Sequence, residues 1–144
     1  FPDVQTDRVY VDAMALFLVQ RPHTFDVVVT ENMFGDILSD LSAGLIGGMG
    51  IAPSADLGPK YGLFQPSHGT APSIAGKGIA NPIATILSVA MMIEWLDHPE
   101  TIRGAQLIHR AVEQVLANPD NCTADLGGTL STAQMGNRVC RALG

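Results

Sequence analysis

The fold of this chain is decided by residues 32–50, which read NMFGDILSDLSAGLIGGMG. Apolar side chains recur at helical spacing in the first part of this stretch and predict a helix over residues 34–45. The second part carries three closely spaced glycines, Gly47, Gly48 and Gly50. Glycine is unfavourable inside helices, so we expect a glycine-rich turn after the helix.

On the N-terminal side of this stretch, the sequence predicts one helix and one strand. The helix is expected over residues 7–21, with Thr6 or Asp7 as its cap and Pro22 as its stop. The short run FDVVV, residues 25–29, is rich in β-branched side chains and predicts a buried strand that leads into the second helix.

On the C-terminal side, residues 51–82 are dense in Gly, Pro and Ser, and predict one long loop. Loops of that length in compact domains are usually functional or disordered. Helices are expected over residues 82–96 and 100–117, and Ser131 or Thr132 can cap a last helix that ends at Leu143. This pattern is α/β but has fewer strands than such a sheet needs, so we expect an incomplete fold.

The composition of the 144 residues narrows the class of protein. Hydrophobic residues make up 47%, which excludes disorder, and charged residues only 15%, which predicts a surface partly covered by another domain or subunit. The net charge is −6, and the eight Lys and Arg residues are scattered along the sequence. Both features argue against a protein that binds nucleic acid. No apolar run is long enough to cross a membrane. Cys122 and Cys140 have no metal-like or disulfide spacing, so a reducing cytoplasm is expected.

Three carboxylates could bind a metal. Asp36 and Asp40 are four residues apart, which places both on one face of the predicted helix. Oxygen ligands in this arrangement suit Mg²⁺ or Mn²⁺. Asp12 falls in an apolar run, where a buried carboxylate needs a partner or a metal. Spacing alone leaves the alternative open, in which the pair is a solvated helix face and Asp12 pairs with an arginine.

The long loop could bind a ligand. Residues 65–82 read QPSHGTAPSIAGKGIANP, and small residues let a ligand approach the backbone closely. His68 and Asn81 offer ring and amide hydrogen bonds. Neither a P-loop nor a G-x-G-x-x-G motif is present, which excludes a standard nucleotide site. Composition alone also allows an ordinary connection in which His68 is a local hydrogen-bonder.

Together these segments resemble the isocitrate/3-isopropylmalate dehydrogenase family, the metal-dependent β-decarboxylating dehydrogenases. Residues 32–40 with 47–50 are similar to its signature, and residues 68–82 to its cofactor loop. Residues 11–14 resemble its third metal-ligand segment, and residues 125–128 its C-terminal turn. The resemblance covers essentially the whole chain and is nearest to the isopropylmalate/tartrate dehydrogenase branch.

The resemblance implies a fold and a domain organisation. The chain is expected to be the C-terminal portion of the isopropylmalate dehydrogenase-like α/β fold, with helices on a mixed sheet that is incomplete here. Residues 1–50 would be part of the small, dimer-forming domain that carries the metal ligands. Residues 51–144 would be part of the large, cofactor-binding domain.

The resemblance also implies an activity. Family members oxidise a 2-hydroxy acid with NAD or NADP and usually release the β-carboxylate as CO₂. Mg²⁺ or Mn²⁺ would be bound by Asp36 and Asp40, with Asp12 contributed by the other subunit of a homodimer. NAD, with NADP possible, would be held by His68, Gly69, Thr70, Ala71, Ser73 and Asn81. No nucleic acid or membrane partner is expected.

The chain departs from the family pattern in several ways. The family is about twice as long, and its catalytic Tyr and Lys are expected in the missing N-terminal half, so no catalytic residue is assigned here. Ser73 stands where NAD-preferring members carry Asp, and Ile74 with no neighbouring cation favours NAD over NADP. Gln65 and Ser67 also differ from the usual residues before the His-Gly pair.

Two questions therefore stay open from the sequence. The substrate is expected to be 3-isopropylmalate-like, with tartrate, malate or isocitrate as alternatives. The alternative function is a non-catalytic, truncated or regulatory subunit that binds nucleotide.

Overall fold

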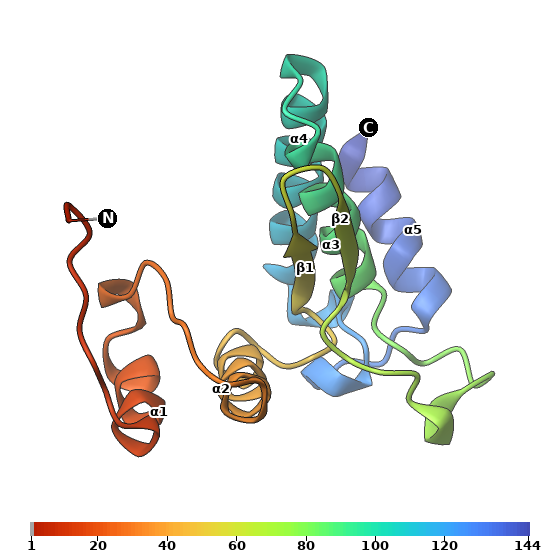
Figure 1. Cartoon of the computed structure of the whole chain (residues 1–144). Helices are drawn as coiled ribbons and strands as arrows, with labels where there is room; N and C mark the ends of the chain where they lie inside the picture. Colours follow the sequence, from red (N-terminus) through yellow and green to blue (C-terminus); the bar gives the residue numbers. More distant parts are fainter. Residues whose placement is uncertain (1) are drawn as a thin grey trace. The chain divides into compact units, whose positions relative to one another are not determined.

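The structure is a computed structural model, and it describes residues 2–144. These residues form two compact units, one that ends at Leu45 and one over Ile46–Gly144 (Figure 1). Helices and one small sheet are present in the described part, so the expected strand-poor α/β content is confirmed.

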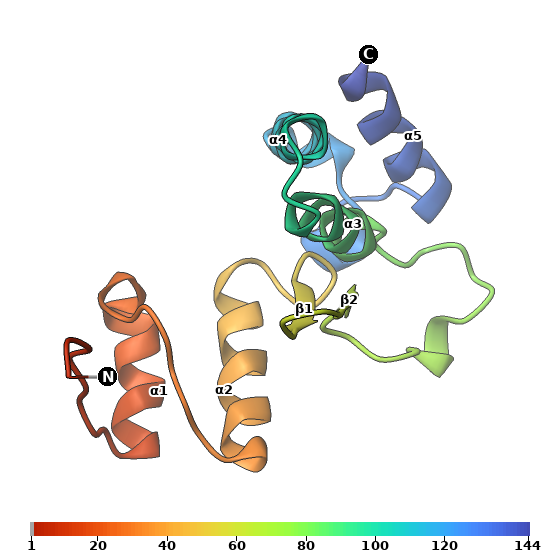
Figure 2. The ribbon, with the colours of Figure 1, turned by 45° about the horizontal axis from the view of Figure 1, so that its top comes forward.

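The first unit consists of two helices joined by a long connection. Helix α1 spans Val11–Gln20, a 3-10 turn η1 covers Pro22–Thr24, and helix α2 spans Asn32–Leu45. The two helices lie side by side and run in the same direction (Figure 2). Met14 and Leu38 are their large buried side chains. The helix predicted over residues 34–45 is confirmed and begins two residues earlier.

The beginning of α1 differs from the prediction, because neither Thr6 nor Asp7 caps it. The helix starts at Val11, and Tyr10 occupies the capping position without a side-chain hydrogen bond. Asp12 Oδ1 instead accepts a hydrogen bond from the Ala13 amide at 2.7 Å. That contact satisfies one of the orphan amides of the first turn. Residues 7–10 are exposed, so no packing extends the helix toward the N-terminus.

The strand predicted over residues 25–29 is wrong for the described chain. These residues belong to no strand, and Val27 and Val29 are 82% and 92% exposed. A strand is stabilised by hydrogen bonds to a neighbour, and the described residues of this unit provide no neighbouring strand. The β-branched pattern therefore indicates a tendency to form a strand, but the described residues do not form one there.

The second unit begins with a hairpin that the sequence analysis missed. Strands β1 (Pro53–Leu57) and β2 (Gly62–Pro66) pair antiparallel, so the loop predicted over residues 51–82 is wrong for these ten residues. Pro53 and Pro66 face each other at the open end. Proline is tolerated there, although it argues against a strand when the sequence is considered alone.

Three helices complete the second unit, and all three confirm the predictions. Helix α3 spans Ile83–Trp95, α4 spans Pro99–Leu116 and α5 spans Thr132–Leu143. Helix α3 contacts the hairpin and α4, and α5 packs on α4 (Figure 2). The buried core of this unit is formed by Ile83, Leu87, Ala111, Val112, Val115, Met135 and Val139.

Local contacts fix the start of α5 and the position of the hairpin. Ser131 Oγ accepts a hydrogen bond from the Gln134 amide at 3.2 Å, and Gln134 Oε1 accepts one from the Ser131 amide at 2.8 Å. This capping box confirms Ser131 as the predicted cap. The Phe64 ring of β2 packs on the Trp95 ring of α3, with ring centroids 5.9 Å apart.

In the described part of the chain, no helix has the length and apolar character needed to cross a membrane.

Candidate metal and cofactor sites

Asp36 and Asp40 lie one turn apart on α2, and both side chains are exposed. Asp36 Oδ2 accepts a hydrogen bond from Asn32 Nδ2 at 3.0 Å, which orients the carboxylate. Two exposed carboxylates at this spacing fit a hard cation, because they present oxygen ligands and neighbouring protein atoms do not bury them. The same exposure also fits a solvated helix face, so the α2 pair is at most part of a metal site.

Asp12 lies in the first turn of α1 and is exposed, so the expectation that it is buried is wrong. The helix begins only one residue earlier, which leaves its first turn open to solvent. Across residues 2–144, no group of three His, Cys, Asp or Glu side chains could hold a metal. The carboxylates of Asp12, Asp36 and Asp40 therefore do not converge within one chain. A role for Asp12 in the neighbouring subunit does not require that convergence and stays a prediction.

The predicted cofactor loop, residues 68–82, is anchored at both ends. Directly before its start, the Ser67 amide donates to the Ala52 carbonyl at 3.1 Å. Near its end, the Thr132 amide donates to the Gly78 carbonyl at 2.8 Å, and Thr132 Oγ1 donates to the Ala80 carbonyl. The loop is thus fixed against the residue that precedes β1 and against the first residue of α5.

Between these anchors the cofactor loop extends away from the packed helices (Figures 1 and 2). The predicted cofactor residues Gly69, Thr70, Ala71 and Ser73 are exposed there, and His68 is half-buried. Ala71 adopts a left-handed backbone with φ of 44°, directly before the 3-10 turn η2 (Pro72–Ile74). An alanine in this region is strained by roughly 1 kcal/mol. Its carbonyl accepts a hydrogen bond from the Ile74 amide at 3.0 Å.

The side chain of His68 has one defined contact. Its Nδ1 lies 2.8 Å from the Gly69 carbonyl oxygen. Because a carbonyl only accepts hydrogen bonds, this contact requires the tautomer with hydrogen on Nδ1, in which Nε2 is free to accept. A half-buried imidazole beside exposed small residues could therefore accept a hydrogen bond from a ligand.

Asn81 stands apart from the exposed segment, although it belongs to the same predicted set. It is only 8% exposed. Its Oδ1 accepts a hydrogen bond from the Ile83 amide at 3.0 Å, and its Nδ2 donates to Asp125 Oδ2 at 3.0 Å. Both ends of its amide group are thus used inside the protein, at the start of α3.

The structure brings Asn81 together with two segments distant in sequence. Asp125 lies in the 3-10 turn η4 (Ala124–Leu126), and its Oδ1 accepts a hydrogen bond from Thr123 Oγ1. Gly50 completes the arrangement, because a Cβ there would lie against Asp125 Oδ2 and 3.0 Å from Asn81 Cβ. Sequence reasoning noted Gly50 and Asp125 in motifs but assigned neither a role. The Thr-x-Asp spacing at residues 123–125 was the available signal.

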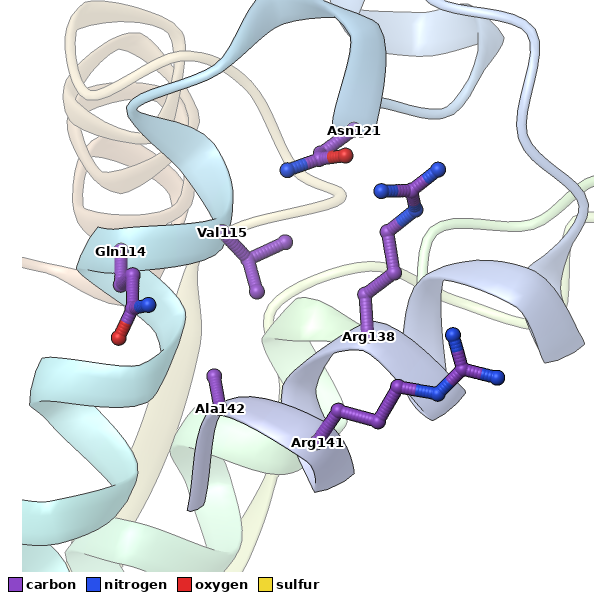
Figure 3. A pocket seen from close by; sticks show the side chains of 6 residues that line it. All are labelled: Gln114, Val115, Asn121, Arg138, Arg141 and Ala142. Carbon is purple, nitrogen blue, oxygen red and sulfur yellow. The ribbon is translucent and has the colours of Figure 1, made fainter. Parts of the chain in front are cut away.

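The pocket shown in Figure 3 lies elsewhere, between α4, the 3-10 turn η3 (Pro119–Asn121) and α5. Its volume is about 230 Å³, and it is lined by Gln114, Val115, Asn121, Arg138, Arg141 and Ala142. None of the predicted metal or cofactor residues lines it. The exposed cofactor residues 69–71 and 73 thus lie outside this pocket.

Comparison with known proteins defines the family. The model of the isocitrate/isopropylmalate dehydrogenase family matches residues 1–139. A 3-isopropylmalate/3-methylmalate dehydrogenase from Methanocaldococcus jannaschii is 49% identical over 98% of this chain and 41% of its own length. An isocitrate/homoisocitrate dehydrogenase from Thermus thermophilus is 50% identical over 99% of this chain and 42% of its own length. The chain thus spans about 40% of the length of these relatives.

A solved structure agrees with the sequence match. The crystal structure of isocitrate dehydrogenase from Methylococcus capsulatus superimposes with a TM-score of 0.87 at 44% identity, over 99% of this chain and 42% of that one. The chain belongs to the isocitrate/isopropylmalate dehydrogenase family, as the sequence motifs indicated. Its helices and hairpin form part of that family's α/β fold, which confirms the expected fold class.

Proposed function

We propose that this chain is part of an NAD-dependent, decarboxylating dehydrogenase that acts on a 2-hydroxy acid similar to 3-isopropylmalate. The observation that carries the proposal is the family match over residues 1–139 in a chain that keeps Asp12, Asp36 and Asp40. The matched relatives are two- to threefold longer than this chain, which supports placing the remaining machinery outside it.

In this proposal the carboxylates on α2 bind the cation. Asp36 and Asp40 are exposed, one turn apart, and Asp36 is oriented by Asn32, so the pair can bind a cation without rearranging a core. When bound, Mg²⁺ or Mn²⁺ supplies charge stabilisation at the substrate oxygens, and NAD accepts the hydride. The hydroxyl proton would pass to a base outside this chain as the hydride passes to NAD, which gives a ketone. Loss of the β-carboxylate as CO₂ would then leave an enolate, which takes up a proton.

The cofactor loop is proposed to bind the adenosine part of NAD. Gly69, Thr70 and Ala71 present exposed backbone with little side-chain bulk, and His68 Nε2 can accept a hydrogen bond. Ser73 is exposed and offers a hydroxyl in place of a carboxylate. A hydroxyl accepts ribose hydrogen bonds less strongly than a carboxylate does, so we expect modest affinity for NAD.

A homodimer is part of the proposal. Leu16 and Val19 on α1 are each 52% exposed, and Ile37 on α2 is 58% exposed. Apolar side chains at this exposure favour burial against another surface. In this proposal a second copy covers these helices, and its Asp12 supplies the third carboxylate. We also place the protein in a reducing cytoplasm, since both cysteines are free thiols.

The second candidate is a non-catalytic subunit that binds nucleotide. It is favoured by the exposure of Gly69, Thr70 and Ala71, together with the finding that the described residues of one chain bring no three carboxylates together. Retention of three aspartates favours the enzyme, because a nucleotide-binding subunit does not need a complete set of metal ligands.

The test is an initial-rate assay of NADH formation at 340 nm with the whole protein and Mn²⁺. Substrates are 3-isopropylmalate, tartrate, malate and isocitrate, each with NAD and with NADP. We expect the highest kcat/KM for 3-isopropylmalate with NAD, and loss of activity with a chelator. NAD binding without turnover of any substrate would support the nucleotide-binding subunit instead.

A further inference from the structure

We propose that Asp125 is a positioning residue for the cofactor loop, acting through the side chain of Asn81. The inference rests on the proposed function only in what the loop binds. The contact between Asn81 and Asp125 lies within the second unit, and hydrogen bonds, burial and steric fit support it.

First, the Asn81 side chain holds neighbouring residues in position and does not contact the ligand. Its Oδ1 caps the amide of Ile83, and its Nδ2 donates to Asp125 at 3.0 Å. With 8% exposure, the side chain has little surface left for a cofactor. What remains exposed at this end of the loop is the chain at Ile79 and Ala80.

The second step is that Asp125 is itself held in place. Thr123 is fully buried, and its hydroxyl donates to Asp125 Oδ1. Asp125 thus accepts one hydrogen bond on each oxygen, one from Thr123 and one from Asn81. A carboxylate is the side chain that can accept on both oxygens at once, whereas an amide of the same shape accepts on only one.

The third step concerns the effect on the loop. Asn81 is the residue before Pro82, directly ahead of α3, and the Gly50 carbonyl accepts the next amide, from Ala84, at 3.0 Å. Without Asp125, the Asn81 amide would be left buried with an unpaired donor, which favours rotation of the side chain. Rotation would release the cap on Ile83 and let the end of the loop move.

The test begins without ligand, in the whole protein. The side-chain amide signals of Asn81 and the backbone signals of Ile79 and Ala80 are followed by ¹⁵N NMR in Asp125→Ala. We expect all three to shift, and the Asn81 amide protons to exchange faster with water. Asp120→Ala is the matched control, since it removes the same charge from an exposed residue of η3. Unchanged Asn81 signals in Asp125→Ala would overturn the proposal.

The second readout is affinity for NAD and for ADP, by calorimetry. We expect roughly tenfold weaker binding of both in Asp125→Ala, the effect of losing one charge-assisted hydrogen bond, with Asp120→Ala at wild-type affinity. NMR shifts with unchanged affinity would overturn the positioning role. If the wild-type protein binds neither nucleotide, the proposed cofactor function fails with it, while the NMR data still decide the Asn81 contact.

Exchange of the two residues at positions 81 and 125 controls for a variant that fails to fold. Asn81→Asp alone places two carboxylates together and should weaken NAD binding. Adding Asp125→Asn lets the new amide donate to the carboxylate at position 81 and still accept from Thr123. We expect the double variant to regain most of the wild-type affinity, a rescue that a general loss of stability would not produce. Double-variant affinity no better than that of Asn81→Asp would contradict the proposal.

Discussion

Replacing Gly50 by alanine tests how closely the three segments around Asp125 fit. The added Cβ would lie 3.0 Å from Asn81 Cβ and 3.3 Å from its Nδ2, and still closer to Asp125 Oδ2. Forcing a methyl group into a packed site costs about 1–3 kcal/mol. The stiffer unfolded chain offsets this by about 0.4–1 kcal/mol. Taking the middle of each range, we expect Gly50→Ala to lower the free energy of unfolding by roughly 1 kcal/mol.

The matched control is Gly136→Ala, the same substitution within α5 of the same unit. No atom lies within 4 Å of a Cβ at position 136, so alanine should stabilise the helix by about 1 kcal/mol. The assay is urea unfolding followed by fluorescence of Trp95, the single tryptophan, which packs on Phe64 in this unit. The two urea midpoints should move in opposite directions. A Gly50→Ala midpoint at or above wild type would refute the steric argument.

Three further predictions concern the core, a cap and the cofactor loop. Met135→Ala should lower the free energy of unfolding by about 2–5 kcal/mol in the same urea assay, because Met135 is fully buried in the core. Ser131→Ala should cost about 1 kcal/mol by thermal unfolding, since it removes the cap of α5; an unchanged midpoint would contradict the capping box. Ser73→Asp should tighten NAD binding about fivefold by calorimetry, and equal affinity would show that position 73 does not face the ribose.

The helices were predictable because their signals are local. Apolar spacing identified α2 and α4, and Ser131 with its neighbours identified the start of α5. The hairpin was not predictable in the same way. Its strands are short and bounded by Pro53 and Pro66, and the packing of Phe64 on Trp95 joins residues about thirty positions apart. The strand predicted at residues 25–29 did not form, although its local pattern is typical of a buried strand. That pattern requires a neighbouring strand, which the described residues do not provide.

The candidate sites show the same difference between signals that are local in sequence and contacts that depend on the fold. The family motifs predict the cofactor loop and the metal-binding carboxylates, because their residues are close in sequence, and both assignments stay predictions. They did not identify Asp125 as a partner of Asn81, because the two are 44 positions apart and only the fold joins them. Exposure of Asp12 was also not predictable, since an apolar neighbourhood in sequence does not bury the first turn of a helix.

The most direct test of the proposed metal-dependent activity is the Mn²⁺ dependence of turnover by Asp36→Asn in the whole protein. Asp26→Asn is the control, since it makes the same change at an exposed residue of the same unit. We expect Asp36→Asn to need at least about tenfold more Mn²⁺ for half-maximal rate and to turn over slowly even at saturation, with the control like wild type. Identical Mn²⁺ curves for Asp36→Asn and wild type would contradict the assignment of α2 as the metal-binding helix.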